Sequence, residues 1–105
     1  MGNENLIHVL QQLRYHGFDY TMICRGTRSC LYRQTYHVKT VGFEVFIISY
    51  QPETILNGIV YPARERRPKD EDFGKTAWSY LTLEQCTVKF QSIEREYSWI
   101  ERYPK

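Results

Sequence analysis

Three segments with strand chemistry follow one another between residues 18 and 50, and this succession constrains the fold more than any other feature. They read FDYTMIC at 18–24, SCLYRQTYHV at 29–38 and FEVFIISY at 43–50, and they are rich in aromatic and β-branched residues. RGTR at 25–28 and a turn between Lys39 and Gly42 separate them. Because the connections are short, an antiparallel meander is favoured. The third segment is the most apolar run, which predicts a central strand covered on both faces.

A helix is predicted on each side of this meander. NENLIHVLQQLRYHGF has leucines at 6, 10 and 13, and Asn3 or Asn5 is its N-cap. Gly17 is predicted to close that helix in a left-handed conformation. Near the other end, Thr82 and Gln85 have capping-box spacing, and Leu83, Cys86, Phe90 and Ile93 follow as an apolar stripe at helical spacing.

The sequence thus predicts one small α+β domain over residues 1–105. We expect a two-layer fold, an antiparallel meander of three or four strands with an N-terminal and a C-terminal helix packed on it. TAWSYLT at 76–82 is the predicted short fourth strand. Asn57-Gly58 is a turn, and IVYPA at 59–63 is a candidate short edge strand. The predicted core consists of Leu6, Leu10, Leu13, Val45, Ile47, Trp78, Leu83, Phe90 and Ile93.

Asp72-Phe73-Gly74 is the tripeptide that holds magnesium in protein kinases, but the other kinase motifs are missing from this chain. It is therefore interpreted as a turn. Asp72 is predicted to bind backbone amides, Phe73 to enter the core and Gly74 to take a positive φ. Asp70, Glu71 and Asp72 lack the alternating spacing of a calcium loop, so no metal site is predicted.

Three cysteines without C-x-x-C spacing and the lack of a signal peptide predict a reducing cytoplasm and buried or idle thiols. No apolar run is long enough for a membrane helix. The histidines and cysteines show no metal-ligand spacing, and no catalytic set is evident. We therefore expect no enzyme activity, no cofactor and no small-molecule substrate.

A basic and aromatic surface is the strongest functional indication in the sequence. Net charge is only +2, but arginines gather in two short regions, and four of the nine tyrosines can interleave with them, namely Tyr20, Tyr32, Tyr36 and Tyr50. Aromatic planes between cations bind bases and phosphates of single-stranded nucleic acid. Tyrosine is also an ordinary strand residue, and exposed arginine an ordinary solubilising one. The candidate partner or nucleic-acid surface comprises Arg25, Arg28, Arg33, Tyr32, Tyr36, Arg64, Arg66, Arg67, Lys69 and Lys75.

GFEVFII at 42–48, followed by DEDFGKTAWSYLTLEQCTVKF at 70–90, resembles a small uncharacterised family of bacterial and phage or mobile-element proteins. The resemblance implies a bacterial or phage-infected cytoplasm. It carries no known activity, so it assigns no functional residues.

Three functional hypotheses remain open, and the least favoured is an enzyme with a cysteine or histidine centre, which requires those side chains to converge in a pocket. The first is a non-catalytic accessory protein that acts through protein contacts, with a protein partner or a second copy of itself. The second is nucleic-acid binding through the arginine- and tyrosine-rich surface, which predicts affinity that falls steeply with salt.

Overall fold

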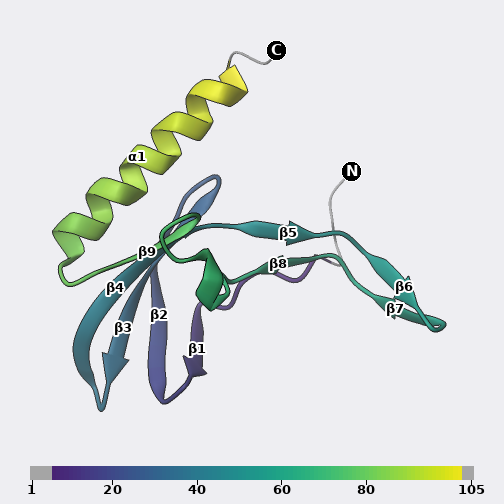
Figure 1. Cartoon of the computed structure of the whole chain (residues 1–105), viewed down its shortest axis with the longest axis horizontal. Coiled ribbons are helices and arrows are strands. Elements are labelled where there is room, and N and C mark those ends of the chain that lie inside the picture. The colour runs from purple at the N-terminus through teal and green to yellow at the C-terminus, as the bar shows by residue number, and fades with distance from the viewer. Residues whose placement is uncertain (1–5, 103–105) are drawn as a thin grey trace.

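The computed structural model describes the backbone of residues 6–102 and the side chains of residues 6–96. Five antiparallel strands form one sheet in the order β1-β2-β3-β4-β9, and two smaller two-stranded sheets extend away from it (Figure 1). The elements are β1 (Gln12–Tyr15), β2 (Phe18–Arg25), β3 (Ser29–Tyr36), β4 (Lys39–Ile47), β5 (Ser49–Gln51), β6 (Thr54–Leu56), β7 (Ile59–Tyr61), β8 (Arg64–Arg66), the 3-10 helix η1 (Asp70–Asp72), β9 (Ala77–Tyr80) and α1 (Leu83–Arg102). The predicted meander of β2, β3 and β4 is confirmed, and β9 is the fourth strand expected around Trp78.

The predicted N-terminal helix is wrong over the described residues. Residues 8–11 form no helix, and Gln12–Tyr15 is strand β1, paired antiparallel with β2. Asn3 and Asn5, the proposed caps, lie outside the described residues. Gly17 does take a positive φ of 84°, but together with His16 it forms the two-residue turn between β1 and β2. The helical spacing of the leucines does not produce a helix here. The hairpin is favoured instead, because strand pairing adds main-chain hydrogen bonds and packs Leu13 on the sheet.

The turn between β3 and β4 lies earlier than predicted. It is made by His37 and Val38, with φ of 50° and 61°, and β4 already begins at Lys39. Tyr36 pairs with Lys39, so only two residues connect the strands. Such turns need positive φ at both central residues because their twist then matches that of the strands. The twist of the hairpin thus forces Val38, a β-branched residue, into an unfavourable conformation.

Both faces of the central strands are covered, and a separate hydrophobic core lies on each face. On one face α1 packs against β3, β4 and β9 (Figure 1). This core contains the buried residues Leu31, Phe43, Val45, Cys86 and Ile93, with Ile47, Trp78, Tyr80 and Phe90 at its margin. The opposite face contains Val9, Tyr20, Cys30, Tyr32, Phe46 and Ala77. Neighbouring residues of β3 and β4 alternate between the two cores, as the period of a strand requires.

The predicted core is therefore only partly confirmed. Val45 and Ile93 are buried, and Leu13, Ile47, Trp78 and Phe90 pack at the margins of the two cores. Leu6 is half-buried, whereas Leu10 and Leu83 are 61% and 39% exposed. The error at Leu10 follows from the helix that does not form.

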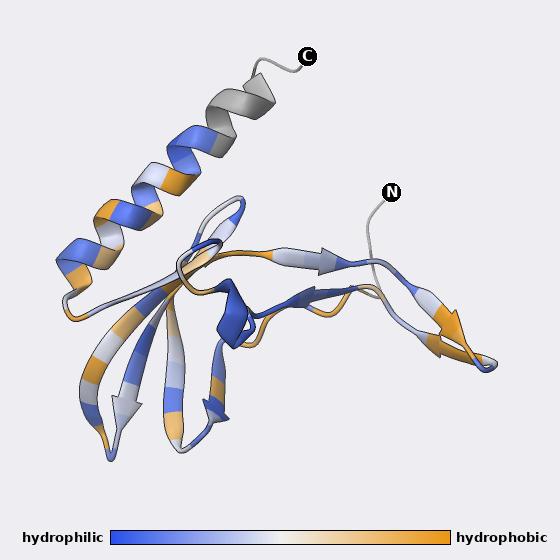
Figure 2. Ribbon diagram, in the orientation of Figure 1, coloured by the Kyte–Doolittle hydropathy of each residue, from blue (hydrophilic) through white to orange (hydrophobic). Residues whose placement is uncertain are grey.

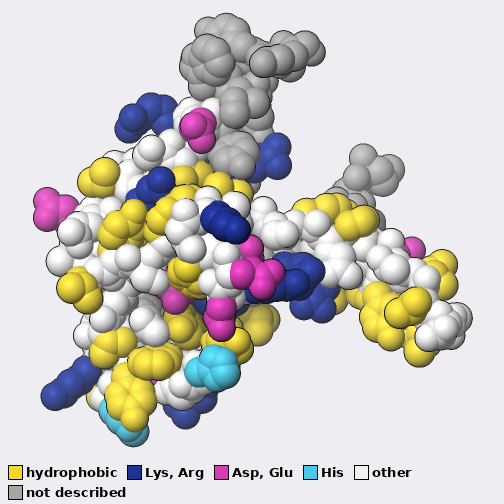
Figure 3. Space-filling view, in the orientation of Figure 1, with side chains coloured by type: hydrophobic (Ala, Val, Ile, Leu, Met, Phe, Trp, Pro, Cys, Tyr) yellow, Lys and Arg dark blue, Asp and Glu magenta, His cyan; other side chains and the backbone are white. Residues whose placement is uncertain are grey.

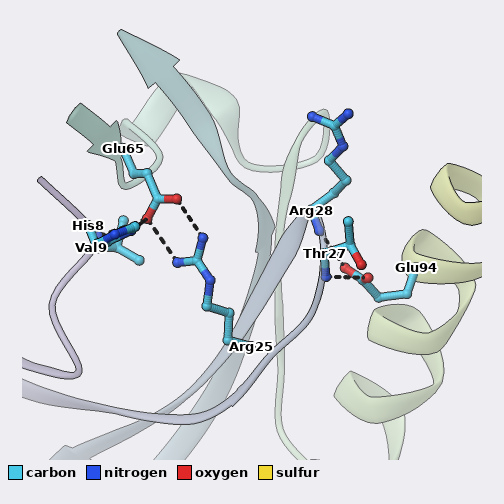
Figure 4. Close-up of polar contacts among 7 residues, drawn as sticks. All are labelled: His8, Val9, Arg25, Thr27, Arg28, Glu65 and Glu94. Carbon is cyan, nitrogen blue, oxygen red and sulfur yellow. Dashed lines mark hydrogen bonds and ion pairs between the residues drawn. The ribbon is translucent and has the colours of Figure 1, made fainter. Parts of the chain in front are cut away.

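Helix α1 begins as predicted and is attached to the sheet by one carboxylate. The N–H of Gln85 donates to the Thr82 hydroxyl at 3.2 Å, and that hydroxyl donates to the Gln85 side-chain oxygen. Further along, Glu94 accepts the N–H of Thr27 at 2.6 Å and of Arg28 at 3.0 Å. Because these residues form the β2–β3 turn, Glu94 fixes the helix to that end of the sheet (Figure 4).

The acidic turn before β9 is largely as predicted. The Asp72 carboxylate accepts the N–H of Lys69 at 2.8 Å, and Gly74 has a φ of 93°. Phe73 is 36% exposed, so its predicted place in the core is wrong. Among the described residues no helix is both long and apolar enough to cross a membrane.

Candidate functional site

The segment from Ser49 to Arg66 forms a projecting β-ribbon that we call the arm. The sequence predicted here the end of the third strand, a turn and a candidate edge strand. Strands β5 and β8 pair at its base, and β6 and β7 pair at its end. Figure 1 shows the arm extending sideways from the five-stranded sheet. Asn57 and Gly58 form its terminal turn, with φ of 53° and 77°. Asn-Gly suits this two-residue hairpin turn because both residues tolerate positive φ.

The end of the arm is apolar and uncovered. We call its large side chains the arm tip; they are Ile55, Leu56, Ile59, Val60 and Tyr61, each between 45% and 66% exposed. Residues 54–61 carry no charge. Figures 2 and 3 show this hydrophobic cluster at the far end of the arm. Contiguous apolar surface of this kind usually marks a place where a soluble protein meets a partner.

The base of the arm is held against the sheet by an ion pair (Figure 4). Arg25 of β2 donates to both carboxylate oxygens of Glu65 in β8, with Nη1 2.8 Å from Oε1. Glu65 also accepts the N–H of Val9 at 3.1 Å and lies 3.3 Å from His8 Nδ1. The hydrogen bonds from Arg25, with those from Val9 and His8, lower the pKa of Glu65 to about 2 although its partial burial opposes them. In its charged form the Glu65 carboxylate therefore joins three segments of the chain, namely β8, β2 and the N-terminal segment.

A second ion pair has the reverse polarity, because its arginine follows the arm and its carboxylate belongs to the main sheet. Arg67 donates to Glu44 of β4 at 3.1 Å, and both side chains are mostly buried. The guanidinium lies 4.8 Å from the ring centre of Tyr20 and 5.7 Å from that of Tyr32. Burial raises the pKa of Glu44, opposed by Arg67. The arm is thus anchored by one arginine from the sheet and one that directly follows its own last strand.

A groove of about 730 Å³ lies beside this base, between the N-terminal segment and β8. Its apolar wall includes Ile7, Leu10 and Tyr15, which are 50%, 61% and 46% exposed. Across from them are Arg64, Arg66 and Lys69, which form no ion pair among the described residues, and Asp70 and Glu71 also line it. Ile7 builds this wall because its backbone pairs with the chain at β8, donating to Ala63 at 2.9 Å and accepting from Glu65 at 2.8 Å.

The predicted basic and aromatic residues are only partly brought together. Arg64, Arg66, Arg67 and Lys69 line the groove, and Arg25 is bound to Glu65 nearby. Tyr32 is fully buried and its hydroxyl donates to the Leu10 carbonyl, so no base can stack on it. The remaining predicted residues lie elsewhere: Arg28 in the β2–β3 turn, Arg33 and Tyr36 on β3, and Lys75 in the turn before β9.

Cysteine chemistry has little geometric support. Cys30 and Cys86 are fully buried, and burial raises their pKa to about 11 and about 12, so both stay protonated. Cys24 is exposed, so two of the three thiols are buried. In the described part of the chain no three His, Cys, Asp or Glu side chains are grouped to hold a metal ion.

The arm tip is not among the functional residues predicted from the sequence. The signal was present, since Thr54-Ile55-Leu56 and Ile59-Val60-Tyr61 flank Asn57-Gly58, and that dipeptide between apolar runs is the strongest short-range hairpin pattern. Pro52 and Pro62 flank these runs, and proline favours irregular structure over a regular strand. No family model matches this chain, and no curated protein or solved structure matches it either. The resemblance stated from the sequence stays a prediction.

Proposed function

We propose that this protein is a non-catalytic binding protein that acts through protein contacts, with the arm as its contact element. The observation that carries the proposal is the arm tip, in which five large apolar side chains stand uncovered at the end of an anchored ribbon. Burying one aliphatic side chain fully contributes about 1.5–3 kcal/mol. Because the five side chains are 45–66% exposed, a partner that covers all of them gains roughly half of this free energy for each, which favours association.

The anchoring of the arm supports the same function. A flexible hairpin would lose conformational freedom on binding, and that loss would weaken the complex. Here the Arg25–Glu65 and Arg67–Glu44 pairs fix the base before any partner arrives. We infer that the arm is held ready for binding.

Nucleic-acid binding is the second candidate, and the observation that favours it is the cationic side of the groove. Arg64 and Arg66 alternate with Glu65 along β8, so they share one side of the ribbon. Lys69 lines the same groove. These cations suit phosphates, but the buried Tyr32 removes one stacking plane from the predicted surface. For this reason we place protein contacts first.

A cytoplasmic location, in a bacterial or phage-infected cell, is part of the proposal. It is supported by three unpaired cysteines, two of them buried as small apolar side chains. The sequence resemblance points the same way.

The test is a pull-down of the tagged 105-residue chain from a bacterial lysate, with and without nuclease. The variants are Ile55→Lys in the arm tip and Val88→Lys on α1 as a matched control, because Val88 is also exposed, at 62%. We expect partners that survive nuclease, disappear with Ile55→Lys and remain with Val88→Lys. Partners lost with nuclease would favour the nucleic-acid candidate, and partners retained by Ile55→Lys would refute the role of the tip.

A further inference from the structure

We propose that the arm tip of one copy docks in the groove beside the arm base of a second copy, and that the second copy makes the same contact in return. The inference rests on the proposed function, since it names the partner of the arm tip. Two arms would lie side by side in opposite directions, related by a two-fold axis. Closed two-fold dimers are the commonest assembly of identical chains.

The position of the groove fits this arrangement. The groove is at the root of the arm, lined by β8 and the residues that follow it, whereas the tip is at the far end. At about 3.3 Å per residue, the strand from residue 49 to residue 57 gives an arm roughly 25–30 Å long. A paired ribbon of this length cannot fold its tip back onto its own root. Two arms laid antiparallel bring each tip to the root of the other.

The surfaces match in polarity. The tip is uncharged, and one wall of the groove consists of exposed apolar side chains, Ile7 and Leu10 among them. The one charged residue between β5 and the tip is Glu53, directly before β6. With the tip in the groove, Glu53 of one copy lies along β8 of the other. Arg64 and Arg66 there carry positive charge that no carboxylate pairs within the described residues.

The area of a stable interface favours a reciprocal contact over a contact between two tips. The large apolar patches of monomeric proteins measure about 300–600 Å². A standard stable interface buries about 800 Å² on each partner. A patch of that size, contributed once by each copy, falls short of this area. In the reciprocal arrangement each copy contributes both a tip and a groove, so each partner buries more surface than in a contact between two tips.

The open edges of the arm tip support the same conclusion. β6 and β7 form a two-stranded sheet, so the outer edge of each is free of a strand partner among the described residues. Exposed apolar edge strands promote pairing with another chain, and natural proteins usually cover them. Two antiparallel arms lying side by side would cover one of these edges on each tip.

Complementation between two variants of the 105-residue chain tests the inference, read by sedimentation over a range of concentrations. Ile55→Lys changes the tip, Leu10→Glu changes the groove, and Val88→Lys is the control away from both. We expect the wild type and the control to dimerise. Each of the first two variants should raise the dimer dissociation constant roughly tenfold or more. Circular dichroism checks that each variant is folded.

Mixing the two variants is the decisive step. In the mixed dimer the altered tip of the Ile55→Lys copy meets the altered groove of the Leu10→Glu copy, so opposite charges face each other. In the second contact, the native tip of the Leu10→Glu copy meets the native groove of the Ile55→Lys copy. The mixture should therefore regain dimers that neither variant forms alone.

Two results would overturn the inference. One is a wild type that stays monomeric at every concentration. The other is a dimer lost with Ile55→Lys but indifferent to Leu10→Glu, because that pattern indicates tips meeting tips.

The inference and the proposed function fail in distinguishable ways. If the wild type is monomeric but Ile55→Lys abolishes capture of another protein, the second copy is refuted as the partner and the binding role of the tip stands. If neither dimerisation nor capture depends on Ile55, both are refuted.

Discussion

Glu65 and Arg25 form a two-point ion pair that joins the arm to the second strand of the main sheet, across 40 residues of sequence. The Glu65 side chain is only 8% exposed, so this pair is shielded from solvent on the carboxylate side. The pair helps to fix both the direction of the arm and the groove beside its base. The direction in which the arm presents its tip therefore depends on a contact far from that tip.

The first prediction concerns acid. The pKa of Glu65 is lowered from its ordinary value to about 2 in the folded chain. The stabilisation that the Glu65 carboxylate contributes is therefore complete at pH values above the ordinary pKa, and it is lost as the pH falls toward 2. A depression of this size corresponds to at most about 3 kcal/mol. Urea unfolding at pH 7, 5 and 3 should show the wild type's advantage over Glu65→Gln shrinking with acid. A constant advantage across that range would contradict the assignment.

The second prediction is a stabilising substitution. Val38 is 96% exposed with a φ of 61°, so glycine removes strain without removing packing. Left-handed backbone costs an L-residue about 1–2 kcal/mol, partly offset by the greater freedom of glycine in the unfolded chain. Val38→Gly should therefore raise the free energy of unfolding by about 0.5–1 kcal/mol in urea denaturation. The control is Val41→Gly, in the same hairpin but within β4, which should lower it.

The third prediction is a coupling between Gly26 and Glu94. A Cβ atom at position 26 would lie 2.3 Å from the Glu94 carboxylate carbon, so alanine there must displace the side chain that fixes α1 to the β2–β3 turn. Gly26→Ala and Glu94→Ala should each destabilise the fold, by about 1–3 kcal/mol. In the double variant the two costs should fall well short of additive, because the clash and the hydrogen bonds disappear together. Additive costs, measured by chemical denaturation, would show the two sites to be independent.

The fourth prediction concerns Trp78. It packs at the margin of the core beneath α1, and the Lys89 ammonium lies 4.0 Å from its ring centre. Because Trp78 is only partly buried, Trp78→Ala should cost about 3 kcal/mol, the lower end of the range for large aromatic residues. Trp78→Phe should recover most of it. An unchanged unfolding midpoint for Trp78→Ala would contradict its place in the core.

The fifth prediction separates folding from binding. Ile55 is 66% exposed, so Ile55→Lys should change the free energy of unfolding by no more than about 0.5 kcal/mol. The same denaturation experiment on Val45→Ala, a fully buried position, should show a loss of roughly 2 kcal/mol. Measured at a protein concentration low enough for the chain to be monomeric, a large loss from Ile55→Lys would indicate that the tip is part of the monomer's own core.

The elements that the sequence predicted well are those specified by neighbouring residues. Thr82 and Gln85 sit three positions apart and cap α1 as expected. The alternating apolar and aromatic residues of β2, β3 and β4 likewise form the expected meander. The candidate surface was predicted less well, because Tyr32 and Tyr36 lie on the same side of one strand by periodicity, yet only Tyr32 is covered. Which part of a strand face is covered depends on segments that arrive from elsewhere in the chain.

The sequence by itself therefore determined the antiparallel meander, the final helix and its cap, since turn chemistry, strand periodicity and capping act over a few residues. Only the tertiary structure decided that the N-terminal leucines join a strand rather than a helix, and that residues 49–66 leave the sheet as an arm. Those outcomes depend on contacts between distant segments, such as Ile7 with β8 and Arg25 with Glu65. Local patterns carry no information on such pairings, because their free energy appears only when the segments meet in three dimensions.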